Sequence, residues 1–208
     1  MQRGSFRITR NSVAWLCASL FFAGCVRATA GQEPVLQQQG FVFALMLCTC
    51  GVLLFAFARV AMALVVTGAL FLGLDFISEI KQQYLDAPLM PSDFVYYLRS
   101  SLVETLAHYP HLWELAAGVA VLVPLGLWLV WRGDRRMLGN LSRPKAFAVR
   151  VGGAVACALV FWICLLPNGP FAQVHARNAW QKLSDDAQLT NFFVNLQDSN
   201  VALPPMTD

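Results

Sequence analysis

The chain has 208 residues, of which 57% are hydrophobic and 13% are charged, and its formal net charge is +3. Soluble domains contain about 45–50% apolar and about 25% charged residues. This composition, with a mean hydropathy of +0.55, argues against a soluble enzyme and against a nucleic-acid-binding domain. Membrane-spanning helices of about 20 residues each would leave too little chain outside the bilayer for a catalytic domain of ordinary size. The sequence therefore predicts an all-α, polytopic membrane protein.

Long apolar runs between charged residues predict a transmembrane domain of five helices over residues 1–170. The predicted spans cover about residues 12–28, 40–58, 60–80, 112–131 and 150–167. The second span contains no charge, and Arg59 separates it from the third. Pro124 lies inside the fourth and predicts a kink, which membrane helices tolerate when a neighbour satisfies the freed carbonyl group.

The lysine and arginine residues predict the orientation of these spans. With the N-terminus inside, ten of the 15 basic residues fall on the cytoplasmic side: Arg3, Arg7, Arg10, Arg59, Arg132, Arg135, Arg136, Arg143, Lys145 and Arg150. The other five fall outside: Arg27, Lys81, Arg99, Arg177 and Lys182. Asp134 is the one acid in a cytoplasmic connection. Because cytoplasmic loops are enriched in basic residues, we expect a cytoplasmic N-terminus and an extracytoplasmic C-terminus.

The first predicted span has two alternative interpretations. Its preceding arginines, its apolar stretch and Ala28-Thr29-Ala30 together are similar to a cleavable signal peptide. The segment Phe22-Ala23-Gly24-Cys25 also partly matches a lipoprotein box. Cleavage would leave four later spans in the same orientation, so the two alternatives stay open without changing the rest of the topology.

The cysteines and histidines predict neither a metal site nor a catalytic centre. All six cysteines lie in apolar segments: Cys17, Cys25, Cys48, Cys50, Cys157 and Cys164. We expect them to be small packing residues, since their spacing does not match a zinc site. The sequence contains no Gly-rich phosphate loop, no nucleophile elbow and no zinc-binding histidine pair. We therefore expect no catalytic residue, no metal ligand and no cofactor in this chain.

Two acids follow the third predicted span. Asp75 and Glu79 are four residues apart, so they share one face of a helix. They lie near its C-terminal end, where the helix dipole disfavours negative charge. Lys81, Arg99 or a bound cation would compensate this charge, and acids at such a membrane boundary indicate a functional site. The alternative is that both acids are simply hydrated at the lipid headgroups.

The connection after this span predicts a short helix at the outer membrane interface. Pro91-Ser92-Asp93 has the composition of a helix start, with Ser92 or Asp93 as the N-cap. The aromatic run that follows, over residues 94–98, is too short to span a bilayer. An interfacial helix in the outer loop is therefore expected.

The same segment carries a family resemblance. The run KQQYLDAPLMPSDF, residues 81–94, resembles the outer loop after the third span of lipoteichoic acid synthase-like proteins, which include phosphoglycerol transferases. Phe94 stands where leucine is commoner in that family. The five predicted spans, the orientation and the basic loop before the last span are also similar.

The resemblance implies a membrane-anchoring module that presents a phosphoglycolipid headgroup to a phosphoglycerol or phosphoethanolamine transferase. Lys81 and Arg99 would meet the headgroup phosphate, and Asp75, Glu79 and Asp93 would order those cations. The sulfatase-type catalytic domain, with its divalent metal, would be separate or downstream, because none of its catalytic residues maps onto this chain. The implied location is the bacterial cytoplasmic membrane.

The alternative function is a small stand-alone integral membrane protein, as a scaffold or as a subunit of an envelope assembly or transporter. No predicted span has a charge near its centre, and we find no internal repeat, which argues against transport. Neither hypothesis involves a nucleic acid.

The tail over residues 171–208 is predicted to be extracytoplasmic. Pro167-Asn168-Gly169-Pro170 ends the fifth span. Beyond it, apolar residues recur mostly every three to five positions at Trp180, Leu183, Ala187, Phe192, Phe193 and Leu196. This spacing predicts a juxtamembrane amphipathic helix, which would lie on the outer leaflet or pack against a further domain.

Overall fold

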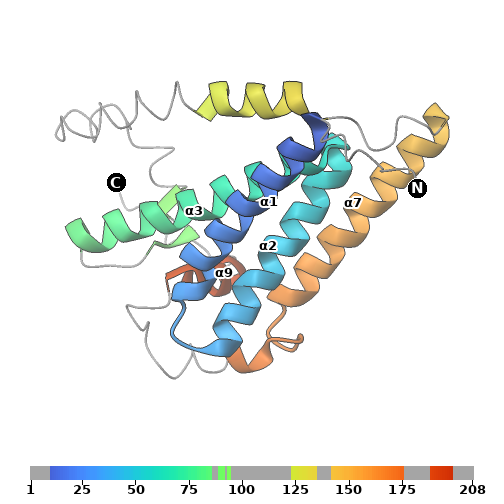
Figure 1. The fold of residues 1–208 in the computed structure, drawn as a ribbon. Coiled ribbons are helices and arrows are strands. Elements are labelled where there is room, and N and C mark those ends of the chain that lie inside the picture. Colours follow the sequence, from blue (N-terminus) through green and yellow to red (C-terminus); the bar gives the residue numbers. More distant parts are fainter. Residues whose placement is uncertain are drawn as a thin grey trace, which may run out of the picture.

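The computed structural model describes residues 10–85, 89–91, 93–94, 123–134, 142–175 and 188–198. Within these residues all regular secondary structure is helical (Figure 1). The named elements are α1 (Arg10–Ala28), the short 3-10 helix η1 (Ala30–Gln32), α2 (Leu36–Phe57), α3 (Val60–Leu85), α7 (Arg143–Leu165) and α9 (Gln188–Asp198). A further helix covers residues 123–133. The expectation of a helical protein is confirmed for the described chain.

Four helical segments are long and apolar enough to cross a membrane. They are Ser12–Gln32, Leu36–Phe57, Val60–Glu79 and Arg143–Leu165. They correspond to the first, second, third and fifth predicted spans. Of the predicted fourth span, residues 112–122 lie outside the described part and residues 123–131 are helical. A multi-pass membrane protein is thus supported, and a count of five spans stays a prediction.

The long helices form a bundle around α2. Helix α2 packs against both α3 and α7, and α1 packs against α3 (Figure 1). On α2 the buried side chains recur one turn apart, so one continuous apolar face is covered by its neighbours. These side chains are Phe41, Val42, Leu45 and Met46. The remaining faces of the bundle expose large apolar groups, and α7 is the least covered of the four candidate spans. Such surfaces suit lipid rather than water.

Two glycines allow neighbouring helices to approach closely. A Cβ at Gly153 of α7 would lie 2.5 Å from the Phe55 ring of α2, and one at Gly51 would lie 2.6 Å from Cys157 Sγ. Small residues at such positions are typical of helix packing in membranes. Cys157 is therefore a packing residue of the α2–α7 interface, as expected from the sequence.

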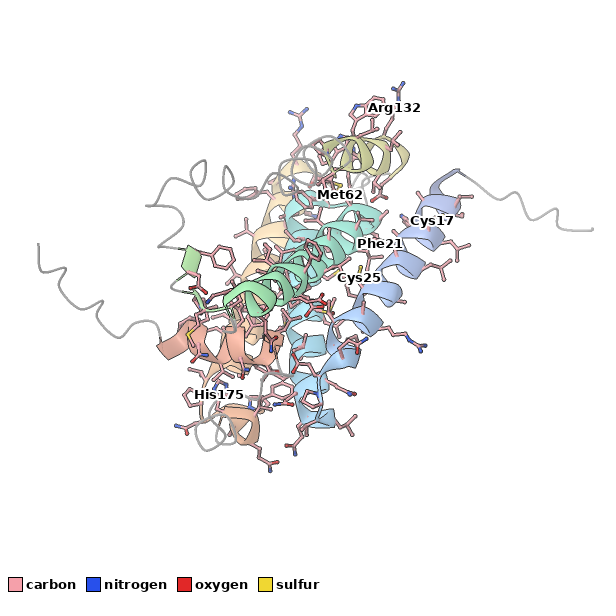
Figure 2. The ribbon with its side chains drawn as sticks, turned by 90° about the vertical axis from the view of Figure 1, so that its left-hand side faces the viewer. Cys17, Phe21, Cys25, Met62, Arg132 and His175 are labelled. Atoms are coloured by element: carbon pink, nitrogen blue, oxygen red, sulfur yellow. The ribbon has the colours of Figure 1, made fainter. Side chains whose placement is uncertain are left out.

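The α1–α3 contact depends on a third glycine. A Cβ at Gly68 would lie 3.0 Å from Cys25 Sγ and 3.1 Å from Phe21 Cε1. Figure 2 shows Cys17, Phe21 and Cys25 along α1. Gly73, one and a half turns further along α3, has no such neighbour within 4 Å.

Replacing Gly68 by valine is therefore expected to lower the free energy of unfolding by about 1–3 kcal/mol, because α1 must move away from α3. Replacing Gly73 by valine on the same helix is the matched control, with a change within about 0.5 kcal/mol. Both changes in the free energy of unfolding are measured by unfolding the full chain in mixed micelles with increasing dodecyl sulfate. Equal losses in the two variants would contradict the packing role of Gly68.

Helix α9 packs on the end of the bundle. Its residues Leu189, Phe192 and Phe193 are buried, and α9 contacts α2, α3 and α7. The Phe193 ring stacks on Phe71 of α3 with a centroid distance of 5.4 Å. The sequence left two arrangements for this tail helix, on the outer leaflet or against a further domain. The structure gives a third, in which the apolar face of α9 is covered by the bundle itself.

Candidate functional site

The charged side chains gather at the two ends of the bundle. At the end where α2 finishes and where α3 and α7 begin, the charged residues described by the structure are mostly basic: Arg59, Arg132, Arg143, Lys145 and Arg150, with Asp134. At the opposite end, they are mostly acidic: Glu33, Asp75, Glu79 and Asp93, with Arg27 and Lys81. We call these the basic end and the acidic end. Figure 2 shows Arg132 at one and His175 at the other.

Two of the predicted site residues meet at the acidic end. Lys81 Nζ of α3 lies 2.6 Å from Asp93 Oδ2, and the two side chains are only 13% and 21% exposed. The Met90 backbone N–H also donates to Asp93 Oδ2, at 2.6 Å. The Asp93 N–H donates back to the Met90 carbonyl oxygen at 3.0 Å. Asp93 therefore closes a tight turn and at the same time holds the ammonium group of Lys81.

The segment around Asp93 is anchored to the bundle. Leu89 and Pro91 are buried, and the Phe94 ring contacts the Phe192 ring of α9 edge-on, at a centroid distance of 5.8 Å. Pro91, Asp93 and Phe94 are helical, whereas the rest of the predicted outer-loop helix lies outside the described residues. The loop is thus joined to α9, a contact that the sequence did not predict.

The other predicted site residues do not share the contact between Lys81 and Asp93. Asp75 is partly buried and lies near enough to Glu79 and Glu33 to interact with them electrostatically. Glu79 is exposed. Arg99 lies outside the described residues. The structure therefore brings together Lys81 and Asp93, with Asp75 and Glu79 further back on α3.

Glu33 is a buried acid that sequence reasoning missed. It is 4% exposed, between η1 and α2. Its Oε1 accepts a hydrogen bond from the Thr190 backbone N–H and its Oε2 accepts one from Thr190 Oγ1, both at 3.0 Å. Burial raises the pKa of Glu33, the bonds from Thr190 oppose that rise, and the nearby Asp75 carboxylate adds to it. Glu33 thus binds the first turn of α9, where a negative charge is favoured by the helix dipole. The sequence feature that could have indicated Glu33 is its position as the one acid between the first two spans.

Asp134 plays a comparable part at the basic end. It is 4% exposed; its Oδ1 accepts a hydrogen bond from Trp15 Nε1 at 3.0 Å and its Oδ2 accepts one from the Met62 N–H at 3.1 Å. Met62 lies in the first turn of α3, so Asp134 satisfies an N–H group that has no partner within that helix. The sequence marked Asp134 as the lone acid of the basic connections, but not its contacts.

Arginines complete the basic end. The Arg59 guanidinium donates to the carbonyl oxygens of Trp131 and Asp134 and lies 4.0 Å from the centroid of the Trp131 ring. Arg150 donates to the Phe55 carbonyl oxygen at 3.0 Å and to that of Ala56. Both carbonyl groups belong to the last turn of α2, where cations are favoured. These contacts hold α7 and the helix over residues 123–133 to the α2–α3 turn.

The described residues include no group of three or more His, Cys, Asp or Glu side chains that could hold a metal ion. His108 and His111 lie outside the described part. His175 contacts the Phe41 ring edge-on, at a centroid distance of 5.9 Å.

No protein-family model, no curated protein and no solved structure matches this chain. The assignment of its function consequently depends on the geometry above and on the resemblance of residues 81–94.

Proposed function

We propose that this chain is the membrane-anchoring and headgroup-presenting module of a lipoteichoic acid synthase-like phosphoglycerol or phosphoethanolamine transferase. The observation that supports the proposal is the pair of Lys81 and Asp93, 2.6 Å apart, within the segment that carries the resemblance. Catalysis and its divalent metal would belong to a separate or downstream domain. The location would be a bacterial cytoplasmic membrane.

The chemistry of the acidic end favours a phospholipid headgroup as the ligand. A lysine ammonium is a cationic hydrogen-bond donor, and phosphate oxygens are among the acceptors that such a group binds most strongly. Asp75 and Glu79, further back on α3, would repel a purely anionic headgroup and attract a cationic amine. Among the two classes that the resemblance implies, the phosphoethanolamine headgroup, which carries both charges, therefore fits this end better.

The charge distribution supports a cytoplasmic basic end and an extracytoplasmic acidic end. In this orientation Lys81, Asp93 and α9 face the outside, where headgroup transfer would occur. A periplasmic reporter enzyme fused after Leu203 should be active. Activity of a cytoplasmic reporter at that position instead would overturn the orientation.

Replacing Lys81 by alanine tests the headgroup role directly. The full chain is reconstituted in nanodiscs that contain equal parts of phosphatidylethanolamine, phosphatidylglycerol and phosphatidylcholine. It is then transferred to detergent, and the retained lipids are counted by mass spectrometry. We expect the wild-type chain to retain more phosphatidylethanolamine than the other two lipids. In Lys81→Ala this enrichment should be roughly tenfold lower than in the wild type, since a hydrogen bond to a charged group contributes about 1.5–3 kcal/mol.

Two matched variants control for charge and for folding. Arg27→Ala removes the other described cation of the acidic end and should retain the lipid, and Lys81→Arg keeps a cation in place. Equal enrichment in wild type and Lys81→Ala would dismiss the headgroup role.

The burial of α9 favours the second candidate, a stand-alone membrane scaffold or subunit. The apolar face of this helix is used within the bundle, through Phe192 and Phe193, and so is not offered to another domain. A chain that is monodisperse in detergent and that shows no Lys81-dependent enrichment of phosphatidylethanolamine would support this candidate over the first.

A further inference from the structure

The first two turns of α7 extend past the end of α2. Arg150 contacts the carbonyl groups of Phe55 and Ala56 in the last turn of α2, so the part of α7 before Arg150 has no α2 backbone beside it (Figure 1). Apart from the partly buried Ala146, residues 142–150 are exposed. Phe147 is 68% exposed and Val149 is 43% exposed. We call residues 143–150 the α7 extension.

The α7 extension carries positive charge that no described acid neutralises. Arg143 and Lys145 make no ion pair with another described residue, and the first turn of α7 contains no acid. Asp134 is the described acid at this end, but its two carboxylate oxygens are bonded to Trp15 and Met62. Among the described residues, no acid therefore competes with a ligand for this positive charge.

Basic and apolar side chains occur close together on this short segment. Arg143 and Phe147 are four residues apart, so they share one face of the helix, and Lys145 lies between them in the sequence. Arg150 already bonds to the α2 carbonyl groups. Water suits the basic side chains but not the phenylalanine, and the hydrocarbon interior of a bilayer has the opposite preference. The boundary between them suits both, because acyl chains cover apolar groups while phosphates meet the cations.

We propose that the α7 extension binds the headgroups of acidic phospholipids, of the phosphatidylglycerol class, in the leaflet at the basic end of the bundle. Charge complementarity selects an acidic lipid over a zwitterionic one, since the described part of this segment holds only basic charge. The surface lies at the opposite end from Lys81 and Asp93, so the inference does not depend on the proposed function.

The test titrates the full chain, in micelles of an uncharged detergent, with dioctanoyl-phosphatidylglycerol and separately with dioctanoyl-phosphatidylcholine. Thermal unfolding followed by tryptophan fluorescence gives the apparent affinity. We expect phosphatidylglycerol to raise the unfolding temperature more than phosphatidylcholine does. The double variant R143Q/K145Q should weaken the apparent affinity for phosphatidylglycerol roughly tenfold or more, since each basic residue near an anionic lipid surface contributes about fivefold.

Matched variants separate this site from general charge effects. Arg27→Gln, at the acidic end, should leave the affinity unchanged, and R143K/K145R should retain it. Equal effects of the two lipids on the wild-type chain would overturn the proposal, as would full affinity in R143Q/K145Q. A shift reproduced by inorganic phosphate alone would also overturn it. Loss of the effect in Lys81→Gln but not in R143Q/K145Q would place the lipid at the acidic end and refute the inference.

Discussion

Replacing Asp134 by alanine is expected to lower the free energy of unfolding by about 2–4 kcal/mol. The substitution removes a buried carboxylate that accepts hydrogen bonds from Trp15 Nε1 and from the Met62 N–H. The N–H group in the first turn of α3 would then lose its acceptor, and unsatisfied buried donors cost about 1–3 kcal/mol each. The Arg59 guanidinium bonds to the backbone carbonyl oxygen of residue 134, which the substitution retains, so this contact is not part of the expected loss.

A double-mutant cycle measures the part of this effect that runs through α1. Trp15→Phe removes the indole donor and retains an aromatic ring, and we expect a coupling energy of about 1–2 kcal/mol with Asp134→Ala. Titration with dodecyl sulfate in mixed micelles gives the four free energies. Glu79→Ala, which removes an exposed acid of α3, is the control and should change stability by less than about 0.5 kcal/mol. Additive losses in the cycle would show that Trp15 and Asp134 do not act as a pair.

The long helices could be predicted from the sequence because a helix that crosses the hydrocarbon core of a bilayer needs a long run of apolar residues. Where the boundaries differ, polar and charged side chains are the reason. The fifth predicted span starts at residue 150, after Arg143 and Lys145, whereas α7 begins at Arg143. A span predicted from hydropathy excludes charged side chains at its ends, whereas the helix itself includes them. Here Ser142 and Pro144 provide the helix start before the apolar run begins. In the same way α2 begins at Leu36, through three glutamines, ahead of the predicted residue 40.

The sequence could indicate which residues belong to the candidate site, but not which of them contact one another. The sequence selected Lys81 and Asp93, because a cation and a helix-start acid occur in one unusual segment. It could not show that they meet, since that contact depends on how the chain turns at Met90. Glu33 and Asp134 were missed as site residues for a related reason. Each bonds to a residue more than 70 positions away, and spacing along the chain carries no information about such contacts.

Replacing Glu33 by alanine is expected to loosen α9 from the bundle. The Thr190 N–H and hydroxyl groups are fully buried and would lose their acceptors, and unsatisfied buried donors cost about 1–3 kcal/mol each. Amide hydrogen exchange of residues 188–198 should accelerate roughly tenfold to a hundredfold, since each 1.4 kcal/mol corresponds to a factor of ten. Exchange in α2 should change much less. Glu33→Gln keeps an acceptor for the Thr190 N–H and should give a smaller acceleration.

The docking of α9 should also depend on pH through the same carboxylate. Burial raises the pKa of Glu33 above its ordinary value of 4.5, with a smaller contribution from Asp75. An acid whose pKa is raised in the folded state binds its proton more tightly there, so its contribution to stability is complete below pH 4.5 and declines as the pH rises through the raised value. Protection of residues 188–198, corrected for intrinsic exchange, should therefore decrease with rising pH across that window. Glu33→Gln, which cannot titrate, should remove this part of the pH dependence, whereas an unchanged slope in that variant would contradict the role of Glu33.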